Sequence, residues 1–387
     1  MISSSVRDLA LVVATFPFIY YLLSIFSSWR FFHQGSKQKP SDAAFTPPVS
    51  NLKPIRGLDP DAYENFASLC RQDYPEYELL FCVGSLEDPV VPVIRQLAHD
   101  YPNQNIRLIV EPRSAAANDK VAKLARLSRE ASHEYLVIND SDVRVNPDYF
   151  RTVVAPLRNP DIGGVTCLYV ATATQTFAEN LQWLGMISDF FPSILTAWQL
   201  EGVKFALGTT IATTRTRLEE AGGYAALINR PADDLLVGRM IAESGAAIEL
   251  LPYAVSTVAD FHSLEDLLKK RLRWIVVMRH IRPIGHLGLL FTHGLAWSAI
   301  AFAICPTASV ASLFFGVYFL LRLAMTWTVG QWGLKQKSVW LKAPLFVIWD
   351  VIALALWLLS FTRDTIHWRD GRYRIRGGRL IPVIAEE

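Results

Sequence analysis

The stretch YLVINDSDVRV, residues 135–145, decides the fold, because an apolar strand ends abruptly in a pair of carboxylates. Its first four residues are β-prone and apolar, which is typical of a buried parallel strand. Asp140 and Asp142 follow on either side of Ser141, where open α/β sheets bind their ligands. Two carboxylates at this spacing can both face a hard cation that keeps positions open for phosphate oxygens. The stretch therefore predicts a Mg²⁺ or Mn²⁺ diphosphate site, with turn residues or helix caps as the alternative.

The composition indicates that part of the chain lies in a lipid bilayer. The 387 residues are 51% hydrophobic with a mean hydropathy of +0.22, too apolar for a soluble protein of this size. The formal net charge is only +2, so the overall charge does not indicate nucleic-acid binding. Four cysteines without CxxC or Cys/His spacing argue against a zinc site and against a disulfide-rich secreted domain. They favour a reduced domain that faces the cytoplasm.

A membrane anchor is expected within residues 1–32. The segment from Leu9 to Ser28 carries no charge and is long enough to span a bilayer. A signal peptide is the alternative, but no basic region precedes this segment and no small-residue cleavage site follows it. Trp29 and Arg30 follow directly, which predicts an uncleaved anchor with its carboxyl end in the cytoplasm. Residues 33–48 are polar and contain prolines, so we interpret them as a linker.

Strand and helix patterns alternate through residues 49–261. This alternation predicts an α/β domain with a doubly wound, mostly parallel sheet, whose strand carboxyl ends carry the site. Ahead of the central strand we expect strands at 49–54, 77–83 and 106–110, and helices at 63–70, 90–99 and 120–130.

Five stretches in order along the chain carry a resemblance to a known family. They are LKPIRGLDP (52–60), QDYPEYELLF (72–81) with Asp88-Pro89, NDKVAKL (118–124), NDSDVRV (139–145), and ADDLLVGRMIAESG (232–245) with RLRW (271–274). Together they resemble membrane-bound GT-A glycosyltransferases of the ceramide glucosyltransferase type, family 21, including bacterial relatives associated with hopanoid lipids. The similarity runs from residue 49 to about residue 280.

The resemblance implies roles for residues of a donor site. Asp88 would help hold the uracil or ribose of the nucleotide, although an aspartate before proline is also an ordinary turn residue. Asn118 and Lys120 would lie near the nucleotide sugar, where the lysine is a suitable point charge for the diphosphate. Asp140 and Asp142 would carry Mn²⁺ or Mg²⁺. Some family members lack the second acid, so its presence here favours metal dependence.

Asp234 is the predicted catalytic base. Asp233 and Asp234 open a segment with helical apolar spacing, where most acids are only N-cap or first-turn residues. The resemblance implies that Asp234 deprotonates the acceptor hydroxyl for direct in-line attack on the anomeric carbon. One base and no covalent intermediate predicts inversion, from an α-linked UDP-sugar to a β-glycoside. Asp233 is the second candidate.

Residues 262–286 combine the RLRW motif with an amphipathic helical pattern. The family pattern is Gln or Arg, two residues, then Arg-Trp, and this chain departs from it with Lys270 at the first position. By resemblance, Arg273 would pair with the diphosphate and Trp274 would form part of the acceptor site. The pattern also fits an interfacial helix that lies on lipid headgroups. The two interpretations are compatible, because a lipid acceptor must be met at that surface.

Residues 177–208 are unusually aromatic for part of a cytoplasmic domain. Ordinary core is one interpretation. The position ahead of the base favours an acceptor groove for an acyl or polycyclic lipid. Asp189 is the polar exception in this segment, and we predict that it contacts a hydroxyl of the acceptor.

Residues 287–362 contain three apolar runs. Runs at 287–304 and 308–329 predict a helical hairpin, and lysines after it mark a cytoplasmic return. A third run, 343–362, is long enough to cross, yet crossing would put the basic tail at 363–387 outside, so the sequence leaves its path open. Arg322 and Asp350 lie inside apolar runs, and we expect them to pair because a lone intramembrane charge is costly.

The sequence thus predicts a metal-dependent, inverting UDP-sugar:lipid glycosyltransferase. Glucose transfer to ceramide is the first expectation, and N-acetylglucosamine transfer to a hopanoid polyol fits the same residues. A processive polysaccharide synthase shares the Asp and RW motifs, but three apolar runs are few for a translocation channel. A membrane scaffold that binds lipid and whose acid pairs are structural is the non-enzymatic alternative.

Overall fold

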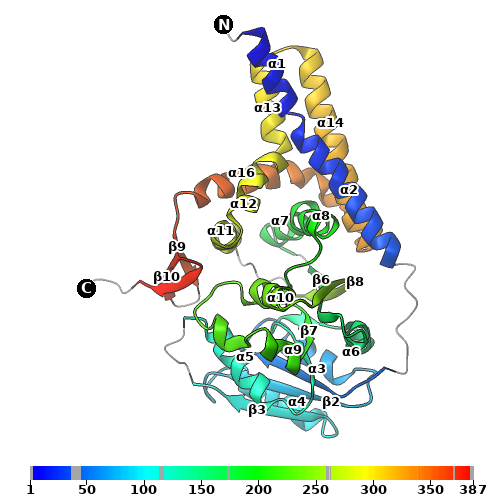
Figure 1. Cartoon of the computed structure of the whole chain (residues 1–387), viewed down its shortest axis with the longest axis vertical. Coiled ribbons are helices and arrows are strands. Elements are labelled where there is room, and N and C mark those ends of the chain that lie inside the picture. Colours follow the sequence, from blue (N-terminus) through cyan, green and yellow to red (C-terminus); the bar gives the residue numbers. More distant parts are fainter. Residues whose placement is uncertain are drawn as a thin grey trace.

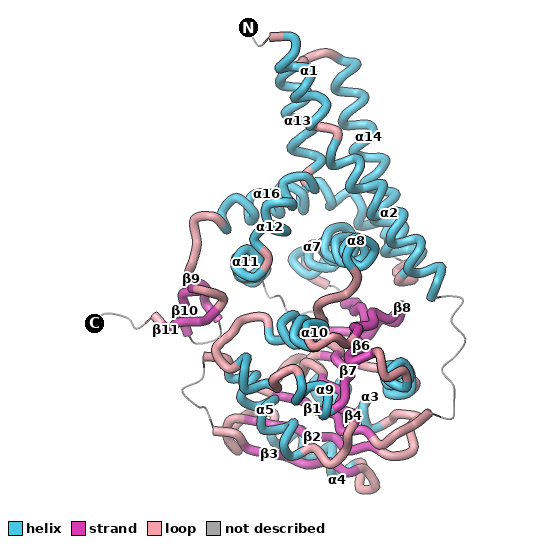
Figure 2. Tube along the Cα trace, in the orientation of Figure 1, coloured by secondary structure: helices cyan, strands magenta, loops and turns pink. Residues whose placement is uncertain are grey.

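An eight-stranded mixed sheet organises the large domain (Figures 1 and 2). The computed structural model describes residues 3–35, 45–112, 117–171, 175–258, 261, 263–337, 339–368 and 371–383. Most of the predicted linker and a few residues of the predicted tail lie outside these ranges. In spatial order the strands are β3 (Asn105–Val110), β2 (Tyr77–Val83), β1 (Val49–Pro54), β4 (Tyr135–Ile138), β7 (Ile211–Thr214), β6 (Ile162–Ala171), β8 (Ala247–Thr257) and β5 (Val143–Arg144).

The pairing of the strands confirms the predicted α/β fold with a mostly parallel sheet. Strands β3, β2, β1 and β4 are mutually parallel, and β6 pairs parallel with β8. The antiparallel strand β7 lies between these two groups, and the short β5 runs antiparallel to β8. The carboxyl end of β4 therefore lies near the middle of the sheet, where the chain turns into Asp140.

Helices cover both faces of the sheet, because the strand residues alternate in direction. On β2, Leu79 and Phe81 face one apolar core while Leu80 and Cys82 face the other, and all four are fully buried. The first core is closed by α3 (Ala62–Cys70), α4 (Val91–Asp100) and α6 (Tyr149–Val154). The second is closed by α5 (Asp119–Glu130), α9 (Arg215–Glu220) and α10 (Asp233–Glu243).

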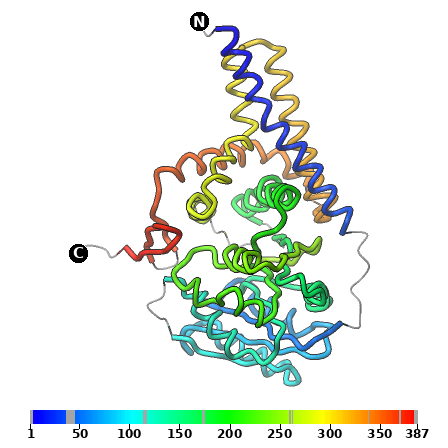
Figure 3. The backbone as a smooth tube through the Cα atoms, viewed as in Figure 1, coloured from blue at the N-terminus to red at the C-terminus, as the bar shows by residue number. Residues whose placement is uncertain are grey.

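Four apolar helices project from this domain as an elongated bundle (Figure 1). In Figure 3, α2, drawn in blue, and α14, drawn in orange, run side by side although they are far apart in the sequence. Three helical segments in the described part are long and apolar enough to span a membrane, namely Ser4–Gly35, Ala308–Gly333 and Val339–Ser360. The four helices are α1 (Ser4–Val13), α2 (Phe16–Gly35), α13 (Gly294–Ile304) and α14 (Ala308–Thr326).

The predicted helix over residues 287–304 is broken at His293. Residues 283–292 and 294–304 form two helical pieces that meet at an angle of 56°. The first piece comprises α12 (Pro283–Gly288) and a 3₁₀ turn (Leu289–Thr292). The bend leaves the His293 ring at 5.6 Å from Trp357, between the bundle and the large domain.

A layer of helices separates the sheet from the bundle. It contains α7 (Phe177–Gly185), the π-helical turn η2 (Met186–Phe190), α8 (Phe191–Glu201) and α11 (Leu264–Ile281). Helix α16 (Phe346–Ser360) lies crosswise over this layer in Figure 1 and contacts both α7 and α11. An aromatic and aliphatic core that includes Trp183, Phe191 and Tyr318 joins the layer to the bundle.

The chain beyond α16 folds back onto the large domain. Strands β9 (Thr365–Trp368), β10 (Gly371–Arg376) and β11 (Arg379–Pro382) form a small antiparallel sheet beside α11 (Figure 2). Its inner residues Ile366, Ile375 and Leu380 pack against Val276 and Val277 of α11. The basic tail therefore lies on the same side of the bundle as the large domain.

The predicted pairing of Arg322 with Asp350 is confirmed. Both side chains are at least 90% buried, and the guanidinium group contacts both carboxylate oxygens. The Tyr318 hydroxyl donates to the same carboxylate over 2.8 Å. Arg322 also donates to the carbonyl oxygen of Ser188 in η2, so this buried pair ties α14 and α16 to the helical layer.

Candidate active site

Lys120 holds two acidic residues together beyond the carboxyl end of β4. Its Nζ lies 2.6 Å from Asp140 Oδ1 and 3.2 Å from Asp233 Oδ2. Burial alone would lower the pKa of Lys120, but the charges of Asp140 and Asp233 outweigh it and hold the pKa well above its usual value. Lys120 is therefore a permanent cation that joins the starts of α5 and α10 to the end of β4.

The Asp234 carboxylate is oriented by two backbone N–H groups. Gly208 donates to Oδ2 over 2.9 Å, and Leu235 donates to Oδ1 over 2.8 Å. Burial raises the pKa of Asp234 to about 6, and the neighbouring charge of Asp233 adds to this shift. Such a carboxylate is more basic than an ordinary aspartate and still largely ionised at neutral pH. Ala232 directly before this pair has a left-handed backbone, with φ 53°, of the kind that clusters at functional sites.

Gly208 fills the space between Asp140 and Asp234. A Cβ atom at this position would lie 2.9 Å from Asp140 Oδ2 and 3.1 Å from Asp234 Oδ2. Any side chain here would push the two carboxylates away from their present positions. Gly208 is a residue of the site that we did not predict, because only the folded chain brings it to the acids.

The Asp140 and Asp142 pair fits a divalent cation. The Asp142 carboxylate makes no hydrogen bond or ion pair with any other described residue, and burial followed by the charge of Asp140 raises its pKa to about 6. A cation would remove this repulsion. No group of three or more His, Cys, Asp or Glu side chains suited to a metal occurs in the described ranges.

Two further lysines face this pair. Lys53 is fully buried on β1 and donates from Nζ to the Asp140 carbonyl oxygen over 2.8 Å. Lys270 of α11 interacts electrostatically with Asp142, and its Nζ lies 4.7 Å from the centre of the Phe261 ring. The position at which the chain departs from the family pattern thus brings a cation to the acid pair.

Asp88 and Asn118 serve the architecture of the site. Asp88 accepts hydrogen bonds from the N–H groups of Gly57 and Val90, at 3.0 Å and 3.1 Å, and so fixes the loops after β1 and β2. Asn118 is fully buried, caps α5 by accepting from Val121, and donates to the carbonyl oxygen of Arg230. Asn118 therefore positions Lys120 and the loop before Asp233, and it does not present its side chain to solvent.

Helix α11 directs the residues of the RLRW motif to different surroundings. The Trp274 ring lies under two cations, with Arg271 at 5.2 Å and Lys270 at 5.6 Å from its centre. Arg273 turns to the other side, 5.9 Å from the Trp368 ring of the small sheet. The small sheet also contacts the loop before Asp233, because Leu380 donates its N–H to the Asn229 carbonyl oxygen over 2.8 Å.

Asp189 lies in the π-helical turn η2, on the side of the helical layer that faces the bundle. It interacts electrostatically with Arg271, His293 and Arg322. Its carboxylate makes no hydrogen bond with a described residue. The structure therefore places Asp189 beside the membrane helices.

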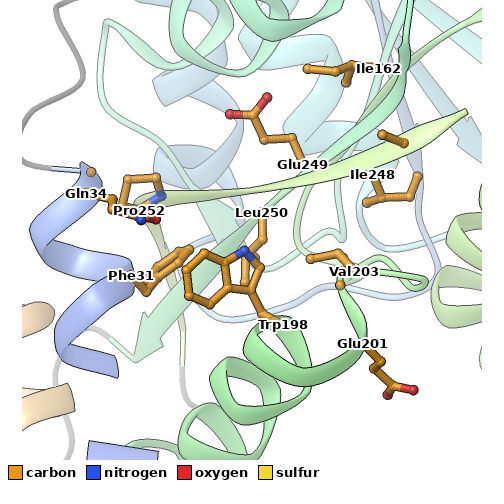
Figure 4. Close-up of a pocket in the computed structure, with 13 residues that line it drawn as sticks. Phe31, Gln34, Ile162, Trp198, Glu201, Val203, Ile248, Glu249, Leu250 and Pro252 are labelled. Carbon is orange, nitrogen blue, oxygen red and sulfur yellow. The ribbon is translucent and has the colours of Figure 1, made fainter. Parts of the chain in front are cut away.

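A cavity of about 480 Å³ opens elsewhere, where the end of α2 meets α8 and β8 (Figure 4). Apolar and acidic side chains share its wall, among them Phe31, Trp198, Leu250, Pro252, Glu201 and Glu249. Its lining contains none of the predicted donor-site or catalytic residues, but Trp198, Glu201, Gly202 and Val203 fall within the segment 177–208 that we predicted to form an acceptor groove.

The fold and the acid cluster at β4 define a glycosyltransferase with a GT-A fold. A solved mannosyltransferase from Pyrobaculum calidifontis, in complex with GDP-Man and Mn²⁺, matches 91% of this chain and 98% of its own length, with a TM-score of 0.59 and 18% identity. The chain belongs to glycosyl transferase family 21, whose family model matches residues 9–381.

The sequence relatives agree with this assignment. A ceramide glucosyltransferase 3 from Caenorhabditis elegans is 23% identical over 397 residues, which covers 97% of this chain and 83% of that protein. A ceramide glucosyltransferase from Komagataella phaffii is 29% identical over 151 residues, covering 37% of this chain and 29% of that protein. The chain is thus a glycosyltransferase of the ceramide glucosyltransferase type.

Proposed function

We propose that this protein transfers a sugar, with glucose favoured, from a UDP-sugar to a hydroxyl group of a ceramide-like membrane lipid, with inversion at the anomeric carbon. The observation that carries the proposal is the Asp234 carboxylate, which Gly208 and Leu235 orient beside the Lys120 cluster. The relatives named ceramide glucosyltransferase support the choice of donor and acceptor.

Asp234 acts as the general base in this proposal. Both of its oxygens accept a backbone N–H and each retains a lone pair, so the carboxylate can take the proton of an acceptor hydroxyl without turning. The deprotonated oxygen attacks the anomeric carbon as the bond to the diphosphate breaks. Because a single base acts and no covalent sugar intermediate forms, an α-linked donor gives a β-glycoside.

Cations on two helices stabilise the leaving diphosphate. Lys120 of α5 is ion-paired with Asp140, Lys270 of α11 interacts electrostatically with Asp142, and Arg273 follows on α11. Asp140 and Asp142 would hold Mn²⁺ or Mg²⁺, which supplies positive charge to the phosphate oxygens. Asp88 and Asn118 keep the loops of the donor site in place through their backbone contacts.

The placement of the charged elements supports a membrane orientation for the site. The large domain and the basic tail lie together at one end of the bundle, and the described cysteines are free. We infer that this end faces the cytoplasm, where UDP-sugars are made and basic segments are retained. On this basis α16 does not cross the bilayer, and it lies at the membrane surface over α7 and α11.

A mass-spectrometric screen tests the proposal. The purified protein is incubated with UDP-glucose, UDP-galactose or UDP-N-acetylglucosamine and with ceramide, diacylglycerol or a hopanoid polyol, with and without Mn²⁺. We expect a hexosylceramide product from UDP-glucose that is lost in Asp234→Asn and retained in Asp161→Asn, whose carboxylate is exposed at the start of β6. Transfer by Asp234→Asn at the native rate would reject Asp234 as the base, and no turnover with any pair would reject the activity.

A further inference from the structure

One face of α7 and η2 carries three residues that meet α11 and α16. Gln182 accepts a hydrogen bond from Arg271 Nε over 2.7 Å. One turn later, the Trp349 indole fills the space next to the Gly185 Cα. A Cβ atom added at position 185 would lie 2.3 Å from this indole. Asp189 follows after one further turn. Arg271 lies 4.7 Å from the centre of the Trp349 ring, so these residues form one contiguous wall.

The polar atoms around this wall lack partners. Arg271 Nη2, Trp349 Nε1 and His293 Nε2 are buried and make no hydrogen bond within the part of the chain that the structure describes. The Asp189 carboxylate has no hydrogen bond to a described residue either, although it interacts electrostatically with Arg271 and His293. Buried donors and acceptors are nearly always satisfied in native proteins, because an unsatisfied group costs stability. Three buried groups without a partner, beside the partly exposed Asp189 carboxylate, indicate that a ligand completes them.

We propose that Asp189, Arg271, Trp349 and His293 form the headgroup site for the lipid acceptor, and that this site takes an uncharged headgroup with several hydroxyl or amide groups. The inference rests on the proposed function and specifies its acceptor. The guanidinium and indole N–H groups donate to a hydroxyl or amide oxygen, while the Asp189 carboxylate accepts from a hydroxyl or amide N–H. Arg271 balances Asp189, and the nearby Arg322 is already paired with Asp350, so an anionic phosphate would face Asp189 uncompensated.

The location suits a lipid that must reach the base. The site lies between the catalytic domain and the helices of the bundle, with Phe190 and Phe191 beside Asp189 in the sequence. Tyr169 of β6 packs against both of these phenylalanine rings and interacts electrostatically with Arg271 and with Asp234. Tyr169 is therefore a neighbour both of a headgroup held at Asp189 and of the base, Asp234.

Binding without a donor is the first test. Full-length protein in detergent is mixed with ceramide, a hopanoid polyol, diacylglycerol or phosphatidylglycerol, and the thermal unfolding midpoint is measured. We expect ceramide or the polyol to raise the midpoint, and phosphatidylglycerol to leave it unchanged. A rise with phosphatidylglycerol equal to that with ceramide would overturn the proposal, since the site would then accept an anionic headgroup.

The kinetic test uses Asp189→Asn, which keeps the shape of the side chain, and Trp349→Phe, which keeps an aromatic ring but removes the indole N–H, with the exposed His99→Gln on α4 as the control. We expect the acceptor KM to rise about tenfold in each variant, as for one lost hydrogen bond, and the donor KM to change less than twofold. Acceptor KM values within twofold of the native value in both variants would overturn the site. A lipid-induced shift in the unfolding midpoint without sugar transfer from any UDP-sugar would instead reject the proposed function and leave the site standing.

Discussion

The donor and acceptor sides of this enzyme differ in how their polar groups are satisfied. Lys120 is ion-paired with both Asp140 and Asp233 before any substrate arrives. Around Asp189, by contrast, the side chains of Arg271 and His293 leave buried atoms without partners. In the proposed function, the protein itself preorganises the Lys120 ion pairs that act on the diphosphate, with Asp142 left for the cation, whereas the lipid would complete the other side. Substitutions on the two sides should therefore change different kinetic constants.

The largest effect is expected from removing the base. Asp234→Asn keeps the shape of the side chain but cannot accept a proton, so we expect kcat to fall on the order of 10³-fold. Binding of UDP to the variant, measured by titration calorimetry, should stay within a few-fold of the native affinity because the Lys120 cluster is intact. A fall in UDP affinity as large as that in kcat would mean that Asp234 belongs to the donor cluster and not to the reaction.

Gly208→Ala should have the next largest effect. The new methyl group would lie within about 3 Å of both Asp140 and Asp234, so at least one carboxylate must move. A displacement of this size typically costs on the order of 10²-fold in rate. Gly316→Ala in α14 is the matched control, since a Cβ atom there meets nothing within 4 Å. Steady-state kinetics of both variants decide whether the close approach at Gly208 matters, and native kcat in Gly208→Ala would show that it does not.

The pH dependence should reveal the buried base. The pKa of Asp234 is raised to about 6 by burial and by Asp233, so its ionised, active form is lost as the pH falls through about 6. Below that point kcat/KM should fall about tenfold per pH unit, whereas an exposed aspartate would keep its activity to about pH 4. A pH-rate profile between 4.5 and 8 measures this limb. A flat profile down to pH 5 would contradict the assignment.

The local elements of the fold could be predicted from sequence because strand and helix patterns alternate along residues 49–261. The strands at 49–54 and 77–83 form with the predicted bounds. The antiparallel insertion of β7 between β4 and β6 could not be predicted, since its four residues give no periodic signal. Apolar composition also concealed the 56° break at His293, because hydropathy records the length of a run and not its backbone direction.

The site was predictable where acids follow a strand or start a helix, and less so elsewhere. Lys120 contacts both Asp140 and Asp233, as we expect for residues at the end of a strand and at the starts of helices. Gly208 and Lys53 escaped prediction because their roles depend on contacts across the fold. Asn118 lies inside a recognisable motif, yet its side chain is a buried cap of helix α5. A motif therefore does not by itself indicate which structural contacts its residues make.

The smallest expected effect concerns the small sheet on the donor side. Trp368 lies 5.9 Å from Arg273, and a partly exposed cation–π contact contributes about 0.5–1 kcal/mol. Trp368→Ala should therefore lower kcat/KM for the UDP-sugar by about two- to fivefold and leave the acceptor KM unchanged. The control is His367→Ala, because the neighbouring side chain is exposed on the opposite face of β9. An altered acceptor KM in Trp368→Ala would show that the two sides of the site are coupled through α11, and the division between a preorganised donor side and a lipid-completed acceptor side would then fail.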